Sequence, residues 1–424
     1  LSAKLSCMAN ERVMLITTRA PGTSERDAFL KESEIRSLIN TLSLTIVCHQ
    51  SFTLKEENPN TYIGSGQANE AREYANAFDV EEVIIDASIS PRQEKNLEKI
   101  FSCPISDRQA VILAIFYQNA HSKEARLQIE KAEAVYLKPR LISREANLSQ
   151  QRGGVRGAKG EGERKLELER RRIDERIKAL DREIDETKRT RRIQRHNRED
   201  SGIYTFALTG YTNAGKSTIL NALTNANVLS KDMLFATLDT TTRSLLLPNG
   251  QKVLLSDTVG FISGLPTLLI DAFSSTLDEA LNANAIIIVA DASHPDALGC
   301  LNVTKETLAR LNAIDKVKLL IINKTDDIYD DISYSMLKNE NIKTIETSFK
   351  DGTGVQKVIK ALTEITDEEF RNVKLKVDIS NSSIVSELSS HGWLKGIEYL
   401  DSCILISARI PKTRLMQYSK YIDT

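Results

Sequence analysis

One stretch decides the fold of this 424-residue chain: Gly210-Tyr211-Thr212-Asn213-Ala214-Gly215-Lys216-Ser217-Thr218. It fits the phosphate-loop pattern G-x-x-x-x-G-K-[ST], in which the lysine reaches the β- and γ-phosphates and the serine holds Mg²⁺. The apolar run 203–208 precedes it and 219–223 follows it, so the motif joins a predicted strand to a predicted helix. Its glycines let the backbone approach phosphate oxygens, and the helix N-terminus adds an anion site. The alternative is a glycine-containing turn before an ordinary helix.

A threonine-rich segment follows the first helix of this region. It includes Phe235-Ala236-Thr237-Leu238-Asp239 and three further residues, Thr240 to Thr242. Threonines before a strand are also typical of an ordinary β-rich segment. The position of the segment favours a switch loop, in which one hydroxyl completes the Mg²⁺ shell and senses the γ-phosphate.

Two motifs at predicted strand ends indicate which nucleotide is bound. The strand at 252–256 ends in Asp257-Thr258-Val259-Gly260, a D-x-x-G motif whose aspartate faces Mg²⁺ through water and whose glycine amide meets the γ-phosphate. The run 319–322 leads into Asn323-Lys324-Thr325-Asp326, an N-K-x-D motif. Its aspartate accepts two hydrogen bonds from guanine, whereas adenine presents the wrong edge. The three motifs, in this order and each after an apolar run, predict GTP binding.

The residue after the D-x-x-G motif is Phe261. Many GTPases have a glutamine there that orients the attacking water. A phenyl ring cannot polarise water, so we expect slow hydrolysis in the isolated protein and help from a partner or from another residue. A second interpretation, compatible with the first, is that Phe261 packs the segment behind the motif.

Composition limits the other classes of function. The net charge is −1, so affinity for nucleic acid must come from a local patch rather than from the whole field. The five cysteines lack metal-ligand spacing and indicate no disulfide framework, which favours a reducing cytoplasm. No apolar run reaches about 18 residues, so we expect no membrane span. The first ten residues lack the apolar core of a signal peptide, and Met8 is one candidate initiator.

The part before the phosphate loop predicts two further structures. Strands alternate with helices over about 10–110, which favours a small parallel α/β domain. Next, 115–140 and 163–190 predict two antiparallel helices, the first ending near Pro139, joined by a basic glycine-rich loop at 149–162. That loop and the all-basic run 188–198 suggest contacts to a nucleic-acid backbone. The alternative is a solvated charged helix face.

Together the motifs resemble those of the HflX family of ribosome-associated GTPases. The phosphate loop, 235–239, 257–262 and 323–326 carry the resemblance. Shorter matches extend it toward the N-terminus, so that it covers most of the chain to about residue 355: Thr61-Tyr62-Ile63-Gly64-Ser65-Gly66, Ser90-Pro91 with Asn96-Leu97-Glu98, Asp107-Arg108, Pro139-Arg140-Leu141 and Leu166-Glu167 with Arg170-Arg171.

The resemblance implies an α/β fold with a P-loop GTPase domain, whose mostly parallel sheet has helices on both faces, over 199–366. A small α/β domain over 1–110 and a long antiparallel helical hairpin over 111–198 precede it, and a small α/β domain over 367–424 follows. Ser217 and Thr237 are the implied Mg²⁺ ligands, with Asp257 acting through water. Lys216, Thr237 and Gly260 are the implied catalytic residues. The implied partner is the large ribosomal subunit, with the hairpin tip toward its peptidyl-transferase centre.

This chain departs from the family pattern at three places. The tip usually reads Arg-Gly-Pro-Gly-Glu, and here reads Lys159-Gly160-Glu161-Gly162-Glu163. Gln67 stands where the family usually has lysine. The base-binding Ser-Ala-Lys becomes Ser348-Phe349-Lys350, which puts a bulky side chain beside the guanine, although backbone amides can still bind the base. These changes indicate a divergent member.

We therefore expect a cytoplasmic, monomeric GTPase that binds the large ribosomal subunit and its rRNA and splits or rescues stalled ribosomes. Its hydrolysis of GTP is expected to be slow without the ribosome. The alternatives are a factor for large-subunit assembly, an RNA-binding factor whose nucleotide site is only structural, and an ATP-dependent remodeller. The N-K-x-D motif argues against ATP in the main site.

Overall fold

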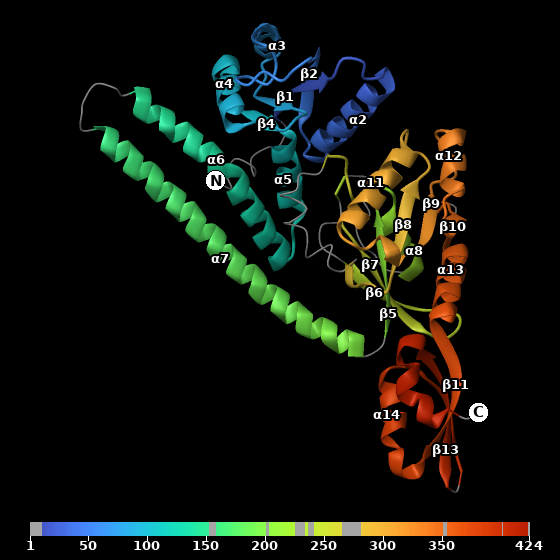
Figure 1. Ribbon diagram of the computed structural model, residues 1–424. Coiled ribbons are helices and arrows are strands. Elements are labelled where there is room, and N and C mark those ends of the chain that lie inside the picture. Colours follow the sequence, from blue (N-terminus) through green and yellow to red (C-terminus); the bar gives the residue numbers. More distant parts are fainter. Residues whose placement is uncertain are drawn as a thin grey trace. The chain divides into compact units, whose positions relative to one another are not determined.

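The computed structural model describes most of the chain (Figure 1). The described residues are 11–151, 158–200, 203–224, 234–235, 241–264, 281–350, 354–400 and 402–422, without the side chains of 142–166 and 191–200. The chain divides into two compact units. The first comprises Leu1–Glu186, Asp232–Asp239 and Gly264–Ser274, and the second comprises Thr187–Lys231, Thr240–Ser263 and Ser275–Thr424.

A four-stranded parallel sheet forms the centre of the first unit. Its order is β2-β1-β3-β4. The strands are β1 (Arg12–Arg19), β2 (Thr45–Thr53), β3 (Glu82–Ile85) and β4 (Ile105–Asp107), and the helices are α2 (Glu25–Thr41), α3 (Ser65–Ala77), α4 (Pro91–Phe101) and α5 (Arg108–Asn119). The predicted start of α4 is confirmed: Ser90 caps it, Gln93 closes a capping box and proline occupies its first turn.

The hairpin consists of α6 (Lys123–Gln151) and α7 (Ala158–Asp200). Lys131 pairs with Asp181 at 2.5 Å, and Lys138 pairs with Asp174. Residue numbers rise along one helix as they fall along the other, so the helices are antiparallel, as predicted. Leu127 packs with Leu180 and Ile184 between them.

The predicted ends of the hairpin helices are wrong. Helix α6 continues past Pro139 to Gln151, and α7 already begins at Ala158, so it includes Gly160 and Gly162. A glycine costs only about 1 kcal/mol in a helix, which a 43-residue helix can absorb. The turn at Pro139 is held by tertiary contacts of the next residue, Arg140.

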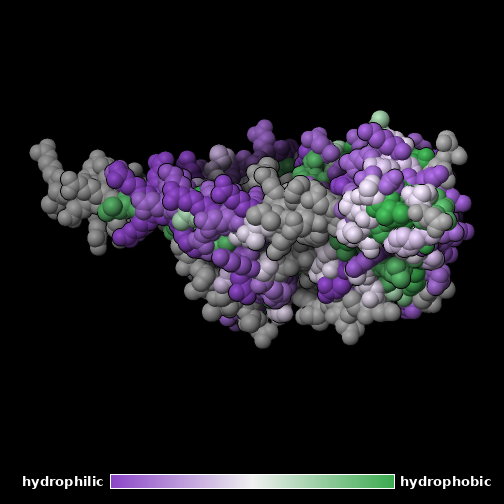
Figure 2. All heavy atoms as spheres, turned by 90° about the horizontal axis from the view of Figure 1, so that it is seen from below, coloured by the Kyte–Doolittle hydropathy of each residue, from purple (hydrophilic) through white to green (hydrophobic). Residues whose placement is uncertain are grey.

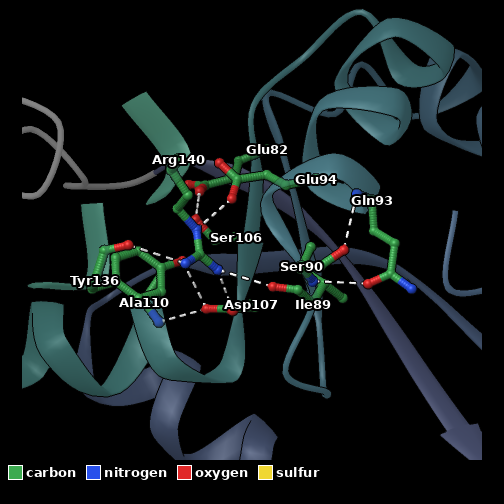
Figure 3. Close-up of polar contacts among 10 residues, drawn as sticks. All are labelled: Glu82, Ile89, Ser90, Gln93, Glu94, Ser106, Asp107, Ala110, Tyr136 and Arg140. Atoms are coloured by element: carbon green, nitrogen blue, oxygen red, sulfur yellow. Dashed lines mark hydrogen bonds and ion pairs between the residues drawn. The ribbon is translucent and has the colours of Figure 1, made fainter. Parts of the chain in front are cut away.

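Arg140 connects α6 to the sheet of the first unit through a buried ionic network (Figure 3). Its Nε lies 2.5 Å from Glu94 Oε2 on α4, and its Nη2 lies 2.9 Å from Asp107 Oδ2 at the end of β4. The same Nη2 donates to the carbonyl of Ile89. The Tyr136 hydroxyl donates to Asp107 Oδ1 at 2.9 Å. Long-range polar contacts thus offset the loss of a helical hydrogen bond at the proline.

The second unit contains a six-stranded sheet of order β10-β9-β8-β5-β7-β6. Only β6 runs antiparallel to its neighbour. Its strands are β5 (Tyr204–Gly210), β6 (Thr241–Leu246), β7 (Lys252–Asp257), β8 (Ala285–Asp291), β9 (Val317–Asn323) and β10 (Thr344–Glu346). Helices pack on both faces, as predicted: α8 (Lys216–Thr224) and α13 (Gly354–Glu369) share one core, and α11 (Ala297–Arg310) and α12 (Asp331–Lys338) share another.

A small antiparallel sheet follows α13 directly. Its order is β11-β13-β12, with β11 (Phe370–Asp378), β12 (Leu394–Tyr399), β13 (Cys403–Pro411) and the helix α14 (Ser383–Ser390). Phe370 and Trp393 share one core with Tyr204 and Phe206 of β5. The small sheet therefore shares one hydrophobic core with the larger sheet.

Apolar side chains on the described surface are scattered among polar ones. The side chains of Ile397 and Tyr399 on the edge strand β12 are exposed. In the view of Figure 2, apolar side chains lie among hydrophilic ones. Among the described residues, every helix is too short or too polar to cross a bilayer.

Candidate nucleotide site

The phosphate loop lies between β5 and α8, where its backbone needs glycine. Gly215 has a φ of +91°, and a Cβ there would lie 2.3 Å from Asn323 Nδ2. At Gly210 a Cβ would lie 2.3 Å from the carbonyl oxygen of Val289 on β8. Asn323 Nδ2 in turn donates to the carbonyl of Ala214 at 3.0 Å. The N-K-x-D asparagine, distant in sequence, thus braces the loop.

Lys216 is buried in the cradle of this loop. Its Nζ donates to the carbonyl oxygens of Tyr211, at 2.8 Å, and Gly210, at 3.2 Å. Burial lowers the pKa of Lys216 to about 8, although the charge of Asp257 opposes this shift. Phosphate oxygens compensate the charge of a lysine better than carbonyl groups do. The ammonium is therefore placed to exchange loop carbonyls for phosphates.

Two of the predicted Mg²⁺ ligands meet beside Lys216. Ser217 Oγ donates to Asp257 Oδ2 at 2.5 Å, and Asp257 is fully buried at the end of β7. A hydroxyl and a carboxylate are the hard oxygen donors that Mg²⁺ takes, with phosphates and water completing its shell. This donor set fits Mg²⁺.

The segment after the D-x-x-G aspartate is paired with the phosphate loop. Thr212 N–H donates to the carbonyl of Phe261 at 2.8 Å, and Phe261 N–H donates to the carbonyl of Gly210 at 3.1 Å. A Cβ at Gly260 would lie 2.7 Å from Thr212 Cα and 3.0 Å from Lys216 Nζ. Only a glycine fits there. The ring of Phe261 is 2% exposed and belongs to the core under α11, as the packing interpretation expects.

The residues predicted to bind guanine lie at the ends of β9 and β10. A hydrogen bond from Ser348 is the main cause that lowers the pKa of Asp326, so its carboxylate stays ionised as an acceptor. Lys350 Nζ lies 3.9 Å from this carboxylate. Lys324 Nζ lies 2.6 Å from Asp291 Oδ2 at the end of β8. Phe349 packs against the core beside Gly354. Whether the ring also narrows the space for guanine stays a prediction.

Phe235 groups with the first unit. Its ring meets that of Phe116 edge-on, with centroids 4.6 Å apart, and its carbonyl accepts a hydrogen bond from Asn119 Nδ2 at 3.1 Å. Ala236, Thr237, Leu238 and Asp239, as well as 152–157 of the hairpin tip, lie outside the described residues.

Sequence reasoning missed two contributors to this site. Asp291 holds Lys324, and Ser263 contacts Tyr211 through side-chain oxygens 2.6 Å apart. The position of Asp291 at the carboxyl end of a buried strand was a usable signal, because its neighbours Asp257 and Asn323 end strands of the same sheet. No local pattern distinguishes Ser263.

A phosphate loop after the first strand of a mainly parallel sheet, with D-x-x-G and N-K-x-D motifs at the ends of neighbouring strands, defines a P-loop GTPase. Family models match three successive stretches: GTP-binding GTPase N-terminal at 31–117, GTP-binding GTPase Middle Region at 119–198, and 50S ribosome-binding GTPase at 205–324.

Curated relatives match over most of their length. The GTPase HflX of Lacrimispora saccharolytica is 35% identical over 95% of this chain and 94% of that protein. GTPase HflX of Chlamydia pneumoniae is 37% identical over 92% and 84%, and that of Treponema denticola is 41% identical over 79% and 88%. The chain belongs to the HflX family of GTPases.

Proposed function

We propose that this protein hydrolyses GTP as a switch on the large ribosomal subunit and its rRNA, and that it splits or rescues stalled ribosomes. The observation that carries the nucleotide part is the Ser217–Asp257 pair at 2.5 Å beside buried Lys216. Family membership and the 50S ribosome-binding family model support the ribosomal part. The protein acts as a cytoplasmic monomer.

The proposed site divides the work among its residues. Asp326 selects guanine, with Asn323, Lys324 and the segment 348–350 around the base. Lys216 and the amides of 210–218 neutralise and orient the phosphates. Gly260 donates its amide to the γ-phosphate, and Thr237 is the second switch contact. Ser217 and Thr237 would hold Mg²⁺ directly and Asp257 would hold it through water, and the bound ion would supply positive charge that stabilises the phosphates during hydrolysis.

The buried ring of Phe261 offers no group to orient water. Hydrolysis is therefore slow until the ribosome supplies or orders a missing group. Segments 235–239 and 257–262 respond to the γ-phosphate, and the hairpin, anchored through Arg140, carries its tip to the RNA. Hydrolysis releases the complex.

Co-sedimentation with separated ribosomal subunits tests this function. The protein is offered small subunits, large subunits or 70S particles with a non-hydrolysable GTP analogue or with GDP. We expect binding to large subunits with the analogue, weaker binding with GDP, turnover stimulated by large subunits, and loss of 70S particles. Nucleotide binding without any turnover in the presence of ribosomes would instead favour a structural nucleotide site. Binding and stimulated turnover without loss of 70S particles would favour rescue or assembly.

A further inference from the structure

The side chain of Tyr211, in the phosphate loop, reaches the segment that follows the D-x-x-G motif. Its hydroxyl accepts a hydrogen bond from the backbone N–H of Ser263 at 2.9 Å and lies 2.6 Å from Ser263 Oγ. Together with the two backbone bonds between the loop and Phe261, four hydrogen bonds join these segments. Gly260 lies within the segment that these bonds hold.

The ring of Tyr211 is itself supported. It is 7% exposed, and its centroid lies 5.9 Å from that of His294. His294 is held in turn, because its Nδ1 accepts from the backbone N–H of Asp296 at 3.0 Å and lies 3.4 Å from Cys300 Sγ. The hydroxyl therefore projects from a fixed ring, which makes it a defined anchor for Ser263 rather than a mobile surface group.

We propose that Tyr211 is a positioning residue for GTP hydrolysis. Its hydroxyl holds 260–263 against the phosphate loop, so that the Gly260 amide is oriented toward the γ-phosphate before GTP arrives. This inference rests on the proposed role of Gly260. Preorganised donors act most strongly where charge develops in the transition state. Phe261 cannot orient water, so this site depends on such donors more than a site with glutamine does.

The inference predicts a selective kinetic effect. Tyr211→Phe keeps the ring and removes the hydroxyl. We expect kcat for GTP, measured with saturating large subunits, to fall by roughly 5- to 20-fold, the loss of one or two hydrogen bonds. KM for GTP and Kd for GDP are expected to stay within about 2-fold, because the hydroxyl faces Ser263 rather than the nucleotide. A merely structural role would change nucleotide affinity and thermal stability together.

Two variants complete the test. Ser263→Ala removes only the Oγ contact and is expected to give a smaller fall in kcat, and the double variant should match Tyr211→Phe because the changes share one contact. Tyr418→Phe is the control. It deletes a 2.6 Å hydrogen bond from Tyr418, in the 3-10 helix Lys412–Tyr421, to Glu387 of α14, neither of which belongs to the proposed nucleotide site, and should leave kcat unchanged.

Equal kcat in Tyr211→Phe and in the parent would overturn the inference. Additive effects of the two substitutions would also overturn it, and if Tyr211→Phe does not fold, an unchanged kcat in Ser263→Ala decides against it. Failure of the proposed function is distinct, because the parent protein itself would then show no stimulated turnover of GTP.

Discussion

The network around Arg140 provides a prediction that tests how the hairpin is anchored. Arg140→Met keeps most of the aliphatic volume of the side chain and removes the cation that faces Glu94 and Asp107. The matched control is Arg171→Met. Arg171 belongs to an ion pair with Glu167 at 2.6 Å, and both of its side chains are more than half exposed.

The expected magnitudes follow from burial. The side chains of Arg140 and Glu94 are each 9% exposed, and that of Asp107 is fully buried. Removing one partner of a buried ion pair costs about 3–5 kcal/mol. An exposed helical pair at this spacing is worth about 0.3–0.5 kcal/mol. The two substitutions should therefore differ in cost by about 3 kcal/mol.

The cost should depend on pH. Burial raises the pKa of Asp107, and Arg140 opposes that shift. Without the arginine the carboxyl pKa rises further, so the folded variant binds a proton that the unfolded chain releases. The contribution of Asp107 to the free energy of unfolding of the variant is therefore fully present at low pH and is lost as the pH rises through the raised pKa. Arg140→Met should be better tolerated at pH 5 than at pH 8.

Amide hydrogen exchange of the full chain, measured at increasing urea concentrations, gives the destabilisation caused by each substitution. Exchange in α4, β4 and α6 reports the stability of the first unit separately. If Arg140→Met destabilises these elements no more than Arg171→Met does, the network does not anchor the hairpin. An equal cost at both pH values would refute the titration argument and leave the packing argument standing.

Three further predictions concern the nucleotide site. Asp326→Asn removes a paired acceptor, so we expect Kd for GDP to rise by about 100-fold and xanthosine diphosphate to become the preferred ligand in competition binding; unchanged GDP affinity would refute the base assignment. The pKa of Lys216 in the free protein is about 8, and bound phosphate favours the charged form of this lysine. In fluorescence titrations up to pH 9, the affinity for GDP should therefore be constant below pH 8 and fall above it, approaching a tenfold loss per pH unit. An affinity that does not change with pH would contradict the burial of this lysine. Gly260→Ala puts a Cβ 2.7 Å from Thr212 Cα and should reduce stimulated GTP turnover by at least about 10-fold, while Gly66→Ala, where a Cβ meets nothing within 4 Å, should be neutral.

The sequence predicted those features that depend on local chemistry. A backbone that must approach phosphate requires glycine at 210 and 215, and base selection requires the N-K-x-D tetrad, so both are visible without a structure. Alternation of strands and helices likewise predicted the parallel sheet of the first unit, and the family resemblance implied the mostly parallel sheet of the second. The short strand β4 was not predicted, because three residues are too few to establish a period.

Long-range contacts explain the rest. Proline at 139 is a local signal for a helix end, yet partners from α4 and β4 hold Arg140 and the helix continues. Strand β12 lacks alternation because nearly all of its residues are exposed. The hydrogen bond between Tyr211 and Ser263 joins residues 52 positions apart, and the local sequence around either residue does not predict it.

The contacts of Phe235 with α5 affect the order in which this protein can fold during its synthesis. Asn119 of α5 bonds to a residue that lies 116 positions later in the chain, beyond the phosphate loop. Domains usually fold in order as they leave the ribosome, the N-terminal one first. Here the first unit lacks one of its own contacts until the loop of the second has been synthesised. Completion of the first unit therefore requires residues that are synthesised after the phosphate loop of the second unit.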